Sequence, residues 1–181
     1  MEQALALAKD IGFSHAALLD PSALEARQDV RDMCITGKCR MYGKSWSCPP
    51  ACGSLEQCAS RMKRYNTGII VQTTALMQDE FDYESVKETE KKHKQMFMTL
   101  TRQMRLLHGN CLPLGAGACT LCRTCTYPDR PCRFPEKRFS SMEAYGLLVS
   151  DVCLKSGLQY YYGPKTLTFT SCILMKEGID Q

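Results

Sequence analysis

The cysteines are the feature that most constrains how this chain can fold. Twelve occur among 181 residues, and most of them fall in two short segments. The first reads "CRMYGKSWSCPPACGSLEQC" over residues 39–58, and the second reads "CTLCRTCTYPDRPC" over residues 119–132. Each segment holds four cysteines, and Cys34 stands just before the first. Because thiols gathered this densely tend to converge on a shared centre, we expect both segments to be loops around such a centre.

The composition argues against a disulfide framework. An apolar content of 44% and a chain of 181 residues are enough for one domain, residues 1–181, with its own core. The N-terminal stretch "MEQALALAKDIGF" does not have the pattern of a secretory signal, and no apolar run reaches the roughly 20 residues of a membrane helix. We therefore expect a cytoplasmic protein whose thiols stay reduced. Disulfides are the minor alternative, which the even number of cysteines would allow.

The second cysteine segment has the spacing of a metal–thiolate site. Cys119, Cys122 and Cys125 are separated by two residues each, and Cys132 follows a turn that contains two prolines. Three thiolates in such steps can surround one side of an iron–sulfur cube, and a fourth completes its ligation. Four thiolates would also hold zinc, although structural zinc sites usually combine two separated pairs of cysteines. The spacing therefore favours a [4Fe-4S] cluster here, with zinc as the alternative.

The first segment offers five cysteines for four ligand positions. Two prolines follow Cys48 and stiffen the loop at that point. Cys58 lies in the first turns of an expected helix, where free N–H groups favour an anionic centre. Cys52 falls between these two better-fixed positions and is left out. The alternative is that two or three of these thiols are simply buried. The predicted ligands of a second [4Fe-4S] cluster are Cys34, Cys39, Cys48 and Cys58.

Outside the two segments, the sequence carries no recognised catalytic signature. Cys111, Cys153 and Cys172 lie in expected strands or on the apolar side of an expected helix, so we interpret them as structural thiols; Cys111 could also replace Cys132 as a ligand. His93 lies on an apolar helical stripe and is interpreted as a core residue. No phosphate loop or dinucleotide-binding glycine motif occurs. The sequence leaves open whether the chain is an enzyme.

Basic residues gather beside both cysteine segments, although the formal net charge is only +4. Arg130 and Lys137 are examples within or next to the second segment. Positive charge here can compensate an anionic metal–thiolate centre or attract an acidic partner; a solvated basic face is the plainer alternative. Nucleic-acid binding is not expected, because aromatic residues do not alternate with the basic ones. We expect an acidic redox partner protein and no membrane association.

Hydrophobic patterns and capping residues predict an α+β fold. Strands are expected at 14–20, 67–77 and 111–117, with a terminal hairpin of strands at 158–162 and 166–175. Helices are expected before Gly12 and at 22–33, 54–64, 82–108 and 140–155. Their order predicts a mostly antiparallel sheet covered by helices on one face, with cysteine-rich metal-binding loops at about 34–58 and 119–132. A small doubly wound α/β sheet is the alternative.

Four stretches, taken together, connect the chain with a known family. They are "VRDMCITGKCRMYGKSWSCPP", "SLEQC", "GACTLCRTCTYPDRPCRFPEKRFSSMEAYGLLVSDV" and "GLQYYYGPKTLTFTSCILM". They resemble the predicted metal-binding family catalogued as domain of unknown function 2284. The resemblance implies a metal-binding protein of iron–sulfur type from an anaerobic prokaryote, with the family pattern falling on the eight cysteines predicted above as ligands. It implies no reaction, because the family is described only by its cysteines.

Three functional classes follow from these features. The first, which we favour, is an electron carrier or redox subunit with two [4Fe-4S] clusters. The second is a cluster-dependent enzyme or maturation factor with an open ligand position on a cluster. The third is an interaction module with structural zinc. A deep pocket beside one cluster would favour the enzyme, whereas eight saturating cysteines near the surface would favour the carrier.

Overall fold

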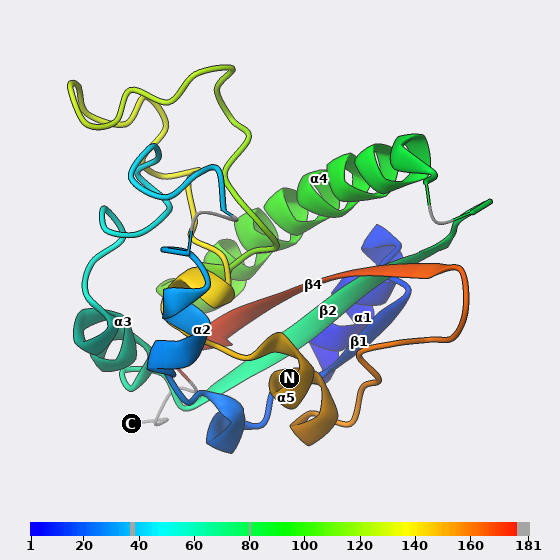
Figure 1. Cartoon of the computed structure of the whole chain (residues 1–181). Coiled ribbons are helices and arrows are strands. Elements are labelled where there is room, and N and C mark those ends of the chain that lie inside the picture. The colour runs from blue at the N-terminus through cyan, green and yellow to red at the C-terminus, as the bar shows by residue number, and fades with distance from the viewer. Residues whose placement is uncertain (37–38, 80, 177–181) are drawn as a thin grey trace, which may run out of the picture.

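The computed structural model describes residues 1–36, 39–79 and 81–176, and a four-stranded antiparallel sheet lies at its centre (Figure 1). The strands follow in the spatial order β1 (His15–Leu18), β2 (Thr67–Leu76), β4 (Thr166–Met175) and β3 (Cys111–Leu114). β2 and β4 pair along their full length, from Thr67 opposite Met175 to Leu76 opposite Thr166. The predicted α+β class is confirmed.

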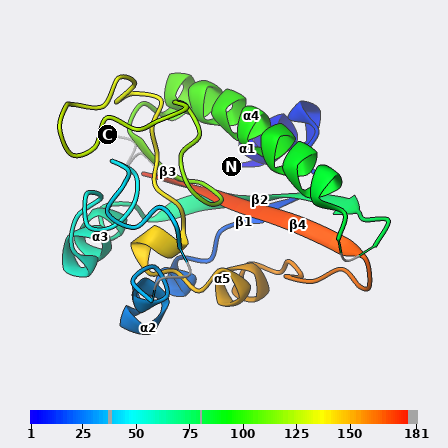
Figure 2. The same cartoon turned by 45° about the horizontal axis from the view of Figure 1, so that its top comes forward.

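Helices cover both faces of this sheet, whereas the sequence predicted them on one face (Figure 2). The helices are α1 (Glu2–Ile11), α2 (Gln28–Asp32), α3 (Leu55–Met62), α4 (Tyr83–His108) and α5 (Val149–Lys155). α1 and α4 pack on the face that carries Ile69, while α3 and α5 lie on the face that carries Ile70. Successive side chains of a strand point to opposite faces. The continuous apolar run of β2 therefore supplies two cores.

Two predicted helix starts are confirmed by their capping bonds. Ser54 Oγ accepts a hydrogen bond from the N–H of Gln57, and the Gln57 side chain accepts one from the N–H of Ser54. At the start of α4, the Asp82 carboxylate accepts the N–H of Ser85. Such bonds satisfy N–H groups that the helix itself leaves free. The first pair fixes the start of α3 and so the position of Cys58.

Two other predicted helices are shorter than expected, and the chain makes one close contact where each of them is interrupted. Residues 22–33 form only a 3₁₀ turn followed by α2, and residues 140–155 form a 3₁₀ turn followed by α5. Between these pieces, the N–H of Arg27 donates to the carbonyl of Gly146 at 2.9 Å. Gly146 has φ +78°, and a Cβ there would lie 3.0 Å from the backbone of Arg27. The two segments approach this closely because the residue is glycine, and neither helix continues through the contact.

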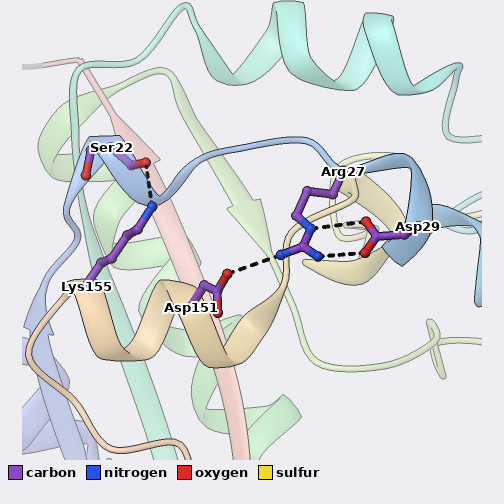
Figure 3. A network of polar contacts seen from close by, with 5 residues as sticks. All are labelled: Ser22, Arg27, Asp29, Asp151 and Lys155. Atoms are coloured by element: carbon purple, nitrogen blue, oxygen red, sulfur yellow. Dashed lines mark hydrogen bonds and ion pairs between the residues drawn. The ribbon is translucent and has the colours of Figure 1, made fainter.

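Polar contacts hold the same crossing of the chain together (Figure 3). The Arg27 guanidinium donates to Asp29 at 2.6 and 3.1 Å and to Asp151 of α5 at 3.3 Å. Lys155, at the end of α5, donates to the carbonyl of Ser22 at 3.4 Å. Each exposed ion pair of this kind contributes about 1 kcal/mol or less. Their combined role is to keep α5 beside the segment that leads into α2.

The predicted hairpin at the end of the chain is also wrong. Residues 158–162 form no strand, because β4 already pairs with β2 on one side and β3 on the other. This segment instead packs against the sheet, where the Tyr162 hydroxyl donates to Gln72 Oε1 at 2.7 Å. The Tyr162 ring also stacks on His15 with 4.3 Å between ring centroids.

Both cysteine-rich segments extend from the end of the sheet where β4 finishes (Figures 1 and 2). They lie side by side in both views, next to α3 and one end of α4. Among the described residues, no helix is long and apolar enough to span a membrane.

Candidate metal centre

The second cysteine loop, residues 119–132, surrounds a cavity of about 300 Å³. All four of its cysteines line this cysteine cavity and are half-buried: Cys119, Cys122, Cys125 and Cys132. The turn that carries the chain to Cys132 is closed by local bonds. The Thr126 hydroxyl donates to the carbonyl of Pro131 at 2.8 Å, and the N–H of Arg130 donates to the carbonyl of Thr126 at 2.9 Å. The last cysteine therefore lies on the same cavity as the first three.

The thiols of this loop have different electrostatic surroundings. Burial raises the pKa of Cys119, and the nearby thiols, of which Cys132 has the largest effect, raise it further. Partial burial also acts to raise the pKa of Cys125, but hydrogen bonds from the backbone of Trp46 and Tyr127 outweigh it and lower the pKa. A thiol must lose its proton to bind a metal. The backbone of the first cysteine loop, through Trp46, thus favours the ligand form of a second-loop cysteine.

In the first cysteine loop, residues 34–58, Cys34 and Cys39 are half-buried and Cys48 is buried; residues 37 and 38 lie outside the described part of the chain. Burial raises the pKa of Cys34, and the neighbouring Cys39 and Cys48 raise it further. Burial likewise raises the pKa of Cys48, with added contributions from Cys39 and from Cys119. The pKa of Cys48 therefore responds to a thiol of its own loop, Cys39, and to a thiol of the second loop, Cys119.

The fourth predicted ligand, Cys58, is fully buried and has Cys52 as its neighbour. The neighbouring Cys52 side chain has the largest effect on Cys58 and lowers its pKa, and the guanidinium of Arg31, 3.7 Å from Cys58 Sγ, lowers it further. The same pairing raises the pKa of Cys52, whose thiol donates to the carbonyl of Ala144 at 3.8 Å. Of the two, Cys58 is therefore the one that loses its proton more readily. Sequence reasoning left Cys52 aside, yet it contacts a predicted ligand.

Arg31 holds this pair in place, a role that the sequence did not reveal. Only 6% of its surface is exposed. Its guanidinium donates to the carbonyl of Ala144 at 2.6 Å, to the carbonyl of Gly53 and to Cys58 Sγ. Within the described residues, no carboxylate forms an ion pair with it. A buried cation requires a counter-charge, and the ionised form of Cys58, whose Sγ lies 3.7 Å from the guanidinium, would supply it.

Trp46 joins the two cysteine loops. Its indole Nε1 donates to the carbonyl of Arg130 at 3.0 Å, and its ring meets that of Tyr127 edge-on at 4.9 Å between centroids. Its own carbonyl accepts a hydrogen bond from Arg138, just beyond the second loop. The loops are therefore one connected unit at the end of the sheet.

The structure places the four cysteines of the second loop around a space rather than at a point. In the described part of the chain, no three Cys, His, Asp or Glu side chains are grouped closely enough to hold a single metal ion. Thiolates on one tetrahedral zinc ion would lie about 3.8 Å apart, since each Zn–S bond is about 2.3 Å. The donors of the cysteine cavity are all thiols, which suits iron–sulfur clusters and zinc.

The three remaining cysteines are buried: Cys111, Cys153 and Cys172. Their burial agrees with a structural role. His93 is fully buried as well, with Thr73 Oγ1 at 2.8 Å and Ser171 Oγ at 2.7 Å from its two ring nitrogens. The prediction that His93 belongs to the core is confirmed.

The model of a family described as predicted metal-binding protein (DUF2284) matches residues 17–175. This range contains β2, β3 and β4 in full, the last two residues of β1 and both cysteine loops. No curated protein and no solved structure matches the chain. The family description includes a metal but names neither the metal nor a reaction.

Proposed function

Since the chain belongs to the DUF2284 family of predicted metal-binding proteins, we propose that it is an iron–sulfur protein that transfers electrons through one [4Fe-4S] cluster in each cysteine loop. The proposed ligands of the first cluster are Cys34, Cys39, Cys48 and Cys58. Those of the second are Cys119, Cys122, Cys125 and Cys132. A bound cluster of this type accepts and returns one electron.

The observation that carries this proposal is the position of four thiols around one cavity of about 300 Å³. A single zinc ion draws its thiolates to about 3.8 Å from one another. The thiolates of a cube bind different iron atoms and stand farther apart, so a larger centre fits the cavity better. The spacing of Cys119, Cys122 and Cys125 supports the same choice.

The surroundings of the loops support electron transfer. The thiols of the second loop are only half-buried, and exposed basic residues, among them Arg123 and Arg130, lie within this loop. Positive charge beside an accessible centre attracts an acidic partner protein. The hydrogen bonds of Trp46 with Arg130 and Arg138 hold the two loops close to each other, as electron exchange between their centres requires.

Metal and sulfide analysis of anaerobically purified protein tests the proposal. We expect about eight iron atoms and eight acid-labile sulfides per chain, with absorption near roughly 400 nm that bleaches on reduction, as expected of two cubes with thiolate ligands. Stoichiometric zinc without sulfide would contradict the proposal and favour a structural zinc module.

A further inference from the structure

Three arginines line a separate cavity of about 300 Å³ beside the cysteine loops. Arg61 comes from α3, Arg105 from α4 and Arg138 from the segment that follows the second loop. All three are half-buried. Cys52 of the first loop and Cys111 of β3 also line this arginine cavity. Three arginines that are far apart in the sequence thus contribute positive charge to the lining of one cavity.

The charge of this cavity is not balanced by carboxylates. Within the described residues, no Asp or Glu lines it, and none of the three arginines forms an ion pair. Their hydrogen bonds go to neutral groups: Arg61 donates to the carbonyl of Cys52 at 2.6 Å, Arg105 to the carbonyl of Glu136, and Arg138 to the carbonyl of Trp46. A guanidinium has five N–H donors, so each arginine keeps donors for another acceptor.

We propose that the arginine cavity binds a small organic anion through a carboxylate or phosphate group. Like charges that face one cavity repel each other, and a bound anion removes this repulsion. The planar fork of a guanidinium matches both groups with two parallel hydrogen bonds. The cavity of about 300 Å³ is at the lower end of the range of small-molecule sites, roughly 300–1,000 Å³, which suits a small ligand.

The bound anion would lie next to the candidate metal centre. Trp46 and Arg138 line both the arginine cavity and the cysteine cavity. Arg61 already donates two hydrogen bonds, to the carbonyl of Cys52 and to the hydroxyl of Tyr145. Arg105 and Arg138 each donate to one carbonyl and so keep more donors for an anion. The inference rests on the arginines and does not depend on which metal the cysteines bind.

Calorimetric titration of the full chain tests this inference, with inorganic phosphate in one arm and malonate in the other. Sodium chloride keeps the ionic strength constant. We expect saturable binding of at least one anion and about tenfold weaker binding in Arg105→Gln and in Arg138→Gln, since each loses a hydrogen bond from a charged group. Arg102→Gln is the matched control, because Arg102 is exposed on the same helix and does not line the cavity.

Absence of binding by the wild-type chain would overturn the inference and leave the arginines as counter-charges of the thiolates. Equal weakening by Arg102→Gln and Arg105→Gln would overturn it too, because it would indicate general surface attraction. A measurement without variants locates the anion: crystals soaked in tungstate, a heavy phosphate analogue, should show an anomalous peak between Arg105 and Arg138. A peak only elsewhere contradicts the inference. Metal content measured on the same samples distinguishes this result from failure of the iron–sulfur proposal.

Discussion

The two cysteine loops are organised by different kinds of interaction. In the second loop, residues 119–132, all four thiols line one cavity, and bonds such as that from Thr126 to Pro131 close the turn within the loop itself. In the first loop, residues 34–58, buried thiols are held from outside, by Arg31 of α2 and by the carbonyl of Ala144. Closely spaced cysteines can thus form a site locally, whereas widely spaced cysteines depend on the folded domain around them.

The largest expected effect is on the iron content, which cysteine variants in the two loops should lower independently. Cys122→Ser in the second loop and Cys48→Ser in the first should each remove about half of the iron, because a hydroxyl is a poor ligand for iron and each loop holds one cluster. Cys52→Ser is the control and should keep all the iron, since Cys52 is the thiol partner of Cys58 and not an assigned ligand. Iron per chain is measured in the three variants.

Two outcomes would break this assignment. If Cys122→Ser and Cys48→Ser each abolish all the iron, the two loops share one centre. If Cys52→Ser is the damaging change, the ligand assignment of the first loop is wrong.

The second prediction compares two arginines that donate to loop carbonyls. Arg31→Met should lower the free energy of unfolding by about 3 kcal/mol, because it leaves Cys58 Sγ and two carbonyls without their donor. Arg133→Met should lower it by less than about 1 kcal/mol, because Arg133 is exposed and donates to Thr124 at the surface. Denaturant unfolding under anaerobic conditions measures both values. Equal losses would show that the first loop is no more dependent on the domain than the second.

The third prediction concerns the sheet on which both loops rest. Burial, with a smaller effect of Lys94, lowers the pKa of His93 to about 4, whereas in the unfolded chain it is about 6.5. Above pH 6.5 the ring is neutral in both states. Below it the unfolded chain takes up the proton first, so stability falls by about 2 kcal/mol between pH 7 and pH 5 and continues to fall toward pH 4.

His93→Gln should reduce this loss, which urea unfolding at pH 7 and pH 5 would measure. An unchanged pH dependence in the variant would assign the loss to other groups. Because His93 is bonded to both central strands, through Thr73 of β2 and Ser171 of β4, circular dichroism and metal release should follow one transition. Separate transitions for the two loops would sharpen the contrast between them.

The smallest expected effect is on association with a redox partner. Reversing the charge of the exposed Arg130 or Lys137 beside the second loop should slow reduction by an acidic electron donor severalfold, more at low salt than at high salt. Stopped-flow reduction at two ionic strengths measures the rate. Arg40→Glu, an exposed change in the first loop, should have less effect. If it slows reduction equally, docking is not confined to the second loop.

Interactions between residues near in sequence were predictable. The capping bonds of Ser54 and Asp82, the apolar runs of β2 and β4 and the helical stripe of α4 all act within a few residues. The short steps between Cys119, Cys122 and Cys125 belong to the same class. The α+β fold and the proposed ligands of the second loop rest on these local signals.

The sequence by itself therefore determined most of the elements and the two candidate metal loops, since propensity, capping and spacing are local properties. Only the tertiary structure decided how the pieces meet. The close approach of Gly146 to Arg27 broke two expected helices, and the pairing of β4 on both sides excluded the expected hairpin. The contact of Arg31 with Cys58 and the convergence of three arginines on one cavity also join distant residues. The free energies of these contacts arise only when folding brings the residues together, so no local sequence pattern predicts them.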